Sequence, residues 1–283
     1  MTTAESAARS VRDVNARGVR TRAVTAGNPK KPAIVLVHDF LVSHLEWDEV
    51  IDPLAEEFFV VAPDLPGFGE SEKPIPGRYP YTVEALSEAV VDVIAALGIG
   101  RASIVGHGLG AAIALTLAAD HAELVQRLVL EGALCYPPPR RIAPQLSHVP
   151  IVGGIFFKQL YSRAMFRSYF QKLVFGPKTT VPLARVDRHY ELLSTPNARE
   201  SAHAVMHAMF DSRPVVARLG RIQKPALVVW GHDDRLLPVQ HAQRLAHELA
   251  GAKLQILDAG HSPHEEIPER FVEHVVAFLS GRR

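Results

Sequence analysis

The sequence is almost free of cysteine: Cys135 is the only one among 283 residues. A lone thiol cannot form an internal disulfide and fits a reducing compartment, so we expect a cytoplasmic protein. No apolar run approaches the length of a membrane span. The stretch from Met1 to Arg17 is polar and rich in alanine and arginine, without the apolar centre of a signal peptide. We therefore expect no membrane span and no secretion signal.

An excess of charge of either sign is also lacking, since 31 Lys and Arg nearly balance 30 Asp and Glu. The charges are unevenly spread, because residues 137–222 hold 13 Lys and Arg against 4 Asp and Glu. Such a segment can bind an anionic partner, but a solvated basic face on an inserted module is the simpler explanation, and we favour it. Because no aromatic-interleaved basic stripe and no nucleic-acid motif accompany it, we expect no nucleic-acid partner.

Short apolar runs alternate with helical patterns along most of the chain. Runs such as residues 33–37 show no polar alternation, as expected of a strand covered on both faces. The alternation predicts an α/β fold with a mostly parallel sheet and helices on both faces. Strands are expected at residues 19–26, 33–37, 58–62, 103–105, 127–131, 225–230 and 253–257, and helices at 47–57, 82–97, 109–119, 239–249 and 271–279.

The alternation is interrupted after residue 131. A stiff proline-rich stretch at residues 136–140 is followed by helical patterns without a clear strand up to about residue 221. We therefore expect residues 1–136 and 222–283 to form the α/β core and residues 137–221 to form a helical cap. The cap is rich in aromatic residues and methionine, which we expect mostly in its core and partly in the roof of an apolar pocket: Phe156, Phe157, Tyr161, Phe166, Tyr169, Phe170, Phe175, Met206, Met209 and Phe210.

Residues 105–111 read Val-Gly-His-Gly-Leu-Gly-Ala, between an expected strand and an apolar helix. This is the strand–turn–helix setting of a nucleophile elbow, Gly-x-Ser-x-Gly, in which a tight turn presents a serine hydroxyl. Gly108 stands at the position of the nucleophile. No side chain there can attack a substrate, so no covalent intermediate can form at this position.

Several short motifs in a fixed order resemble the α/β-hydrolase superfamily, from about residue 19 to the C-terminus. They are His38 after the first buried strand, Trp47, the loop at residues 64–71, the elbow, the Trp230–Pro238 stretch and Gly260-His261. The resemblance is to cap-bearing esterases, epoxide hydrolases and dehalogenases, and it implies their fold.

The resemblance also implies roles for individual residues. His261 occupies the position of the catalytic base, and Asp234 that of the acid that orients it. Glu131 matches an alternative acid position in some relatives, or else caps a helix or lies at the surface. The backbone amides of Phe40 and Leu109 match the oxyanion donors.

Asp39 departs from the family, in which glycine usually follows the histidine equivalent to His38. Because its loop borders the site, Asp39 is expected either to place a carboxylate near Gly108 or to face solvent or an arginine.

Other candidate sites have ordinary explanations. His203 and His207 have helical i, i+4 spacing but no third ligand in view, so we expect a plain cap helix and no metal. Cys135 lacks a partner base and is expected to be packed. His107 is also expected to be packed. The glycines of the elbow lack the Rossmann spacing, and no cofactor is expected.

Three hypotheses for function remain open. In the first, His261 and Asp234, with or without Asp39, perform general acid–base chemistry on a small hydrophobic molecule without a covalent intermediate. That chemistry would be water-activated hydrolysis or a lyase, isomerase or cyclase reaction. An anionic group on the substrate would meet arginines of the cap.

The second hypothesis is an engineered serine-to-glycine variant of a serine esterase-like hydrolase, for which Asp39 remains unexplained. The third is a non-catalytic ligand-binding or scaffold member of the fold, because one fold can host catalysts and non-catalysts alike.

Overall fold

A computed structural model of the chain describes residues 9–137 and 162–281, and its core is one eight-stranded sheet. The strand order is β1-β2-β4-β3-β5-β6-β7-β8. The pairs β1/β2 and β2/β4 are antiparallel and the other neighbours are parallel, which confirms the expected mostly parallel sheet. The bounds are β1 Ser10–Ala16, β2 Val19–Ala26, β3 Ala33–Val37, β4 Phe59–Pro63, β5 Ala102–His107, β6 Val125–Glu131, β7 Ala226–Gly231 and β8 Lys253–Leu257.

Strand β1 was not predicted from the sequence. It lies at the edge of the sheet, pairs only with β2, and its side chains are mostly exposed. Asp13 on β1 accepts a hydrogen bond from Arg22 on β2 at 3.0 Å. An edge strand with charged side chains has no apolar face that could reveal it in a sequence pattern.

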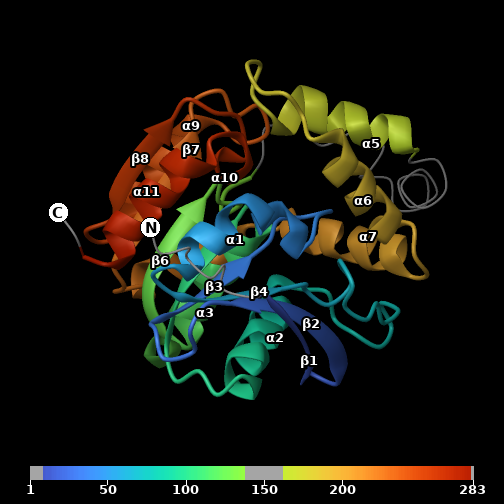
Figure 1. Cartoon of the computed structure of the whole chain (residues 1–283), viewed down its shortest axis with the longest axis horizontal. Helices are drawn as coiled ribbons and strands as arrows, with labels where there is room; N and C mark the ends of the chain where they lie inside the picture. The colour runs from blue at the N-terminus through green and yellow to red at the C-terminus, as the bar shows by residue number, and fades with distance from the viewer. Residues whose placement is uncertain (1–8, 138–161, 282–283) are drawn as a thin grey trace, which may run out of the picture.

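Helices cover both faces of the sheet (Figure 1). Helices α1 (Asp48–Ala55) and α11 (Pro268–Leu279) pack with Ile34 and Leu36 of β3 in one apolar cluster. Helices α2 (Val83–Ala96), α3 (Leu109–Asp120) and α9 (Val239–Glu248) pack with Val35 and Val37 in the other. Neighbouring strand residues thus serve opposite faces, as the pleat requires.

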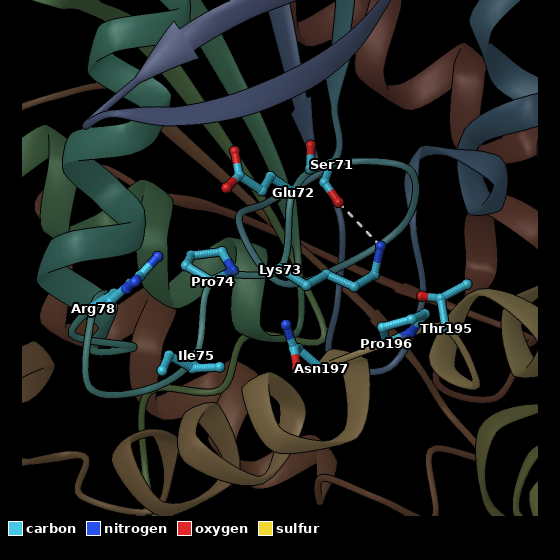
Figure 2. A pocket seen from close by; sticks show the side chains of 9 residues that line it. All are labelled: Ser71, Glu72, Lys73, Pro74, Ile75, Arg78, Thr195, Pro196 and Asn197. Atoms are coloured by element: carbon cyan, nitrogen blue, oxygen red, sulfur yellow. Dashed lines mark hydrogen bonds between the residues drawn. The ribbon is translucent and has the colours of Figure 1, made fainter.

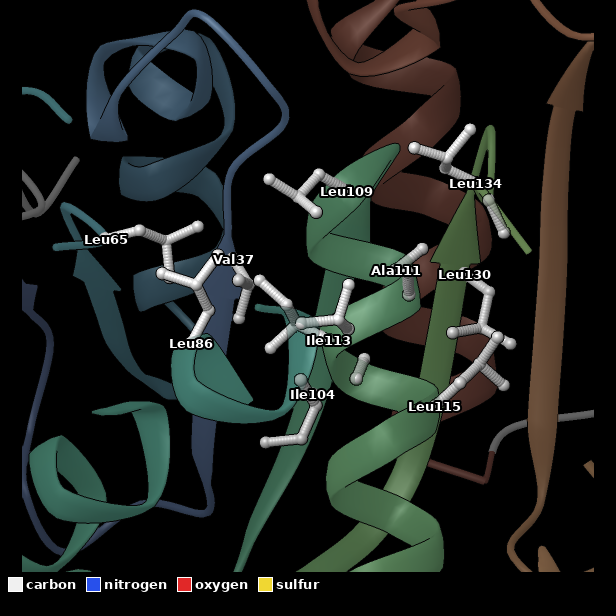
Figure 3. Packing of buried hydrophobic residues seen from close by; sticks show 14 of the residues in the cluster. Val37, Leu65, Leu86, Ile104, Leu109, Ala111, Ile113, Leu115, Leu130 and Leu134 are labelled. Atoms are coloured by element: carbon white, nitrogen blue, oxygen red, sulfur yellow. The ribbon is translucent and has the colours of Figure 1, made fainter. Parts of the chain in front are cut away.

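Helix α3 is buried along almost its whole length, as its uniformly apolar sequence predicted. Figure 3 shows Leu109, Ala111, Ile113 and Leu115 of this helix among side chains from the sheet and from α2. Because α3 begins directly after Gly108, this packing also fixes the elbow.

Between β6 and β7, the described residues form helices and no strand. They are α5 (Arg163–Tyr169), a π-helical turn (Phe170–Val174), α6 (Leu183–Leu193), α7 (Ala198–Met209), the short α8 (Arg213–Val216) and a 3₁₀ turn (Leu219–Arg221). Helices α5, α6 and α7 lie together on the right of Figure 1. Phe166, Phe170 and Phe175 are buried there, whereas Phe156, Phe157 and Tyr161 lie outside the described residues.

Several arginines of this positively charged segment form ion pairs with carboxylates of the core. Arg188 lies 3.3 Å from Glu70, Arg218 2.9 Å from Asp120 and Arg221 2.7 Å from the same carboxylate. These three arginines therefore face acidic residues of the core. Because these arginines are already paired with carboxylates, they are weaker candidates for binding an anionic group of a substrate.

No helix within the described ranges is long and apolar enough to cross a bilayer.

The parallel strands all end at one edge of the sheet, where such folds place their sites. Asp39 follows β3, Gly108 follows β5, and Glu131 ends β6. Asp234 follows β7 and His261 follows β8.

Candidate active site

The elbow has the geometry that its sequence predicted. Gly108 has φ 52° and ψ −110°, a backbone conformation that residues other than glycine rarely adopt. A Cβ at Gly110 would run into the Val37 carbonyl, so helix and strand approach closely there. The Gly108 carbonyl accepts hydrogen bonds from the amides of Ala112 (3.3 Å) and Leu134 (3.1 Å).

Asp39 occupies the space that a side chain at position 108 would need. A Cβ built on Gly108 would overlap the Asp39 carboxylate. Asp39 Oδ1 accepts a hydrogen bond from the Leu109 amide at 2.6 Å. Leu109 is the first residue of α3, and the N-terminus of a helix favours an anion. Of the two expected alternatives for Asp39, the structure shows the carboxylate beside Gly108.

His261 lies between two carboxylates. Its Nδ1 is 2.7 Å from Asp234 Oδ2, and its Nε2 is 3.4 Å from Asp39 Oδ2. Asp234 is itself held by the amides of Leu236 and Leu237, both 2.8 Å from its Oδ1. The structure thus brings together the three residues predicted as catalytic, His261, Asp234 and Asp39.

The two carboxylates set the charge state of His261. Burial alone would lower the pKa of His261, but Asp234, and then Asp39, outweigh it and raise this pKa well above its ordinary value. Burial would raise the pKa of Asp39, but the hydrogen bond with His261, the charge of His261 and the Leu109 amide lower it to about 2. Both carboxylates therefore favour the protonated form of His261.

The two predicted oxyanion donors are the backbone amides of Leu109 and Phe40. The Leu109 amide donates to Asp39, so it is engaged in this state. Phe40 is half-buried in the Asp39 loop, and its ring packs edge-on against Phe68 with centroids 6.1 Å apart. The assignment of both amides as oxyanion donors stays a prediction.

Glu131 bonds His264 rather than His261. Its Oε1 accepts from the His264 amide at 3.0 Å, within the short helix α10 (Pro263–Glu266), and its Oε2 lies 2.9 Å from His264 Nδ1. The side chain is fully buried, so the expectation of a surface position was wrong, whereas a capping role agrees with the contact. Of the two candidate orienting acids, Asp234 and not Glu131 is the one in contact with His261 Nδ1.

One residue of this region was missed by the sequence analysis, the buried Glu46. Its Oε1 accepts from the Asp39 amide at 3.1 Å, and its Oε2 lies 3.1 Å from His107 Nδ1. His107 is buried as expected, and its Nε2 lies 3.1 Å from the His261 carbonyl. The only signal in the sequence is that Glu46 precedes Trp47, one of the motif residues of the resemblance.

Among residues 9–137 and 162–281, two groups of three side chains place possible metal-ligating atoms within 4.8 Å of one another, Asp39–His107–His261 and Glu46–His107–His264. Both depend on His107, whose ring nitrogens already contact Glu46 and the His261 carbonyl. This arrangement is that of a hydrogen-bond network.

The other candidates behave as ordinary structural residues. His203 and His207 lie with their Nε2 atoms 3.3 Å apart on α7 and belong to neither of those groups. Cys135 is buried, and burial raises the pKa of its thiol far above the ordinary value, which is the opposite of an activated nucleophile.

A pocket of about 570 Å³ lies where the loop after β4 meets the α6–α7 junction (Figure 2). None of the three residues predicted as catalytic lines it. Lys73 in this pocket donates to the carbonyls of Gly69 and Ser71, so its ammonium group is engaged. The lining residues are Ser71, Glu72, Lys73, Pro74, Ile75, Arg78, Thr195, Pro196 and Asn197.

Comparison with known proteins gives consistent results. A family model for the alpha/beta hydrolase fold matches residues 32–268. An uncharacterised protein of Mycobacterium tuberculosis is 31% identical over 266 residues, covering 88% of this chain and 75% of that protein. The 2-hydroxymuconate semialdehyde hydrolase of Pseudomonas putida is 29% identical, covering 78% of this chain and 76% of the enzyme.

The solved structure of 2-hydroxy-6-oxo-6-phenylhexa-2,4-dienoate hydrolase from Rhodococcus sp. strain RHA1 is also similar. Its TM-score is 0.83 at 26% identity, covering 97% of this chain and 99% of that one.

Proposed function

The chain belongs to the α/β-hydrolase family, and from this premise we propose that it hydrolyses a small hydrophobic substrate by acid–base catalysis through Asp39 and His261, without a covalent intermediate. Asp234 orients His261 in this proposal. The observation that carries it is the position of Asp39. Its carboxylate fills the space beside Gly108 and lies 3.4 Å from the His261 ring, where the missing nucleophile would contact the base.

The lowered pKa of Asp39 suits a general base, and the raised pKa of His261 suits a general acid. The Asp39 carboxylate accepts a proton from a bound water molecule as that water attacks the substrate. The His261 imidazolium donates its proton to the leaving group. Asp39 then returns its proton to His261 over their direct contact, which restores the starting state. Positioned acid–base groups of this kind accelerate reactions by about 10²–10⁴-fold.

The named relatives favour hydrolysis among the reactions that such a pair can perform. A 2-hydroxymuconate semialdehyde hydrolase and 2-hydroxy-6-oxo-6-phenylhexa-2,4-dienoate hydrolases are both similar to this chain. Lyase, isomerase or cyclase chemistry needs the same two proton-transfer groups, and it is the second candidate because Asp39 and His261 face each other directly.

Isosteric substitution tests the roles of these residues. Turnover of the two relatives' substrates and of a panel of aryl esters is compared for Asp39→Asn, His261→Gln and the wild type. Asp39→Asn keeps the shape of the side chain and removes its charge, so kcat should fall by about 10²–10⁴-fold. Asp13→Asn, which removes an exposed carboxylate on β1, is the matched control. Undiminished turnover by Asp39→Asn or by His261→Gln would rule out the proposal.

The engineered-variant hypothesis predicts a different response to Gly108→Ser. If a serine had been removed from a conventional hydrolase, restoring it would restore ester hydrolysis and labelling by a serine-directed phosphonate. We expect neither, because Asp39 occupies the place of that side chain. The scaffold hypothesis predicts tight ligand binding without conversion and no effect of His261→Ala on that binding.

A further inference from the structure

A second layer of buried groups joins the loops that carry Asp39 and His261. Glu46 precedes α1 in a 3₁₀ turn (His44–Trp47), and its side chain is essentially inaccessible to solvent. One carboxyl oxygen binds the Asp39 backbone and the other contacts His107, which in turn contacts the His261 backbone. The chain of contacts from Asp39 to Glu46, His107 and His261 is built from three separations of 3.1 Å.

The partners of these atoms restrict where the protons lie. The His261 carbonyl only accepts, so His107 Nε2 must carry a hydrogen. The Asp39 amide only donates, so Glu46 Oε1 must accept. A neutral His107 then presents a bare Nδ1, and the hydrogen between His107 and Glu46 must come from Glu46 Oε2. The alternative is an ionised Glu46 facing an imidazolium at position 107.

The surroundings of Glu46 favour the neutral acid. Burial raises the pKa of Glu46 well above its ordinary value, and the charges of Asp39 and Glu131 raise it further. The Asp39 amide and the positive charge on His261 oppose this rise without overcoming it. The titratable groups that act on or lie close to Glu46 are Asp39, His107, Glu131, His261, His264 and Glu265.

We propose that Glu46 is a neutral carboxylic acid that, together with His107, forms a hydrogen-bonded strut between the backbones of the Asp39 and His261 loops. Glu46 is thus a positioning residue, because it fixes the separation of Asp39 and His261 without touching substrate. Its effect on turnover rests on the proposed function, whereas its protonation state does not.

Vibrational and nitrogen NMR spectra test the protonation state without any substrate. The infrared difference spectrum between the wild type and Glu46→Gln should contain the carbonyl band of a protonated carboxylic acid at neutral pH. Glu123→Gln, which removes a glutamate whose side chain is 73% exposed, is the control, and the difference spectrum between it and the wild type should contain no such band. The His107 ring should be neutral, with hydrogen on Nε2 alone. A carboxylate band for Glu46, or a doubly protonated His107, would overturn the proposal.

Kinetics test the positioning role. Glutamine reproduces both contacts, because its amide oxygen accepts from Asp39 and its NH₂ group donates to His107. Glu46→Gln should therefore keep most of the turnover, whereas Glu46→Leu should lower kcat by about 10²-fold through misplacement of the catalytic pair, with little change in KM.

Failure of the positioning role and failure of the proposed function give different results. Equal losses in Glu46→Gln and Glu46→Leu, with the wild type as reference, would refute the strut. Absence of turnover in the wild type would instead count against the proposed function, and the spectra would still decide the state of Glu46. If Glu46→Leu does not fold, Glu46→Gln and the spectra of the wild type carry the test.

Discussion

Gly108→Ala should destabilise the protein through two separable effects. Alanine in the φ 52°, ψ −110° conformation of Gly108 carries backbone strain of about 1–3 kcal/mol. Its Cβ also displaces the Asp39 carboxylate from the Leu109 amide, which costs a charged hydrogen bond of about 1.5–3 kcal/mol. The side chain of Asp39 is 15% exposed, so the displaced carboxylate recovers part of its hydration and the second cost lies in the lower half of its range.

A double-mutant cycle separates the two effects. The free energy of unfolding is measured by urea titration for the wild type, Gly108→Ala, Asp39→Ala and the double variant. In the Asp39→Ala background only the strain remains, so the cost of Gly108→Ala should shrink by about 1.5 kcal/mol or more. Equal costs of Gly108→Ala in the two backgrounds would refute the reasoning, because they would mean that Asp39 does not occupy the space beside Gly108.

Two further predictions concern charge. Activity should be level from about pH 5 to neutrality and fall on the alkaline side, because Asp39, whose pKa is lowered to about 2, stays ionised and His261, whose pKa is raised, must be protonated. Protonated His261 also stabilises the fold: this stabilisation is complete below the ordinary histidine pKa and is lost as pH rises through the raised pKa of His261 in the folded protein. Asp39→Asn should shift the loss of activity and the loss of stability to lower pH. Activity that rises through neutrality would contradict this. Burial raises the pKa of Glu265 to about 8, so this side chain is mostly ionised only above that pH. At about pH 9, Arg185→Gln should lower the free energy of unfolding by about 3 kcal/mol, because it leaves the buried Glu265 carboxylate, 2.9 Å from Arg185, without its partner. The loss should be smaller at about pH 5, and Glu265→Gln should remove the difference between the two pH values.

The strands of the core were largely predictable because they are buried on both faces. β3, β5 and β7 are completely buried; β3 and β7 appeared in the sequence as apolar runs, and β5 was expected from the shorter stretch at residues 103–105. β1 was not predictable, because pairing with β2 rather than an apolar face holds it in place. The helices between β6 and β7 were expected as a group, but their ion pairs with the core depend on tertiary placement that no local pattern contains.

The site was predictable where a residue follows from a motif. His261 and Asp234 lie in contact, as the order of the motifs implied. The direction of the Asp39 side chain did not follow from the sequence, because it depends on the Leu109 amide and on the space that Gly108 leaves open. Glu46 lies in a stretch where an acidic residue ordinarily faces solvent, so only the fold reveals that it is buried.

A single turnover in ¹⁸O-labelled water tests the central claim most directly, namely that Asp39 assists water and does not itself bond to the substrate. With enzyme in excess over the best substrate of the panel, the account predicts that the first product carries ¹⁸O and that the peptide containing Asp39 keeps its original mass. Incorporation of ¹⁸O into the Asp39 carboxylate, together with unlabelled first product, would contradict the account, because it would show that Asp39 attacks the substrate and that water later cleaves the resulting ester.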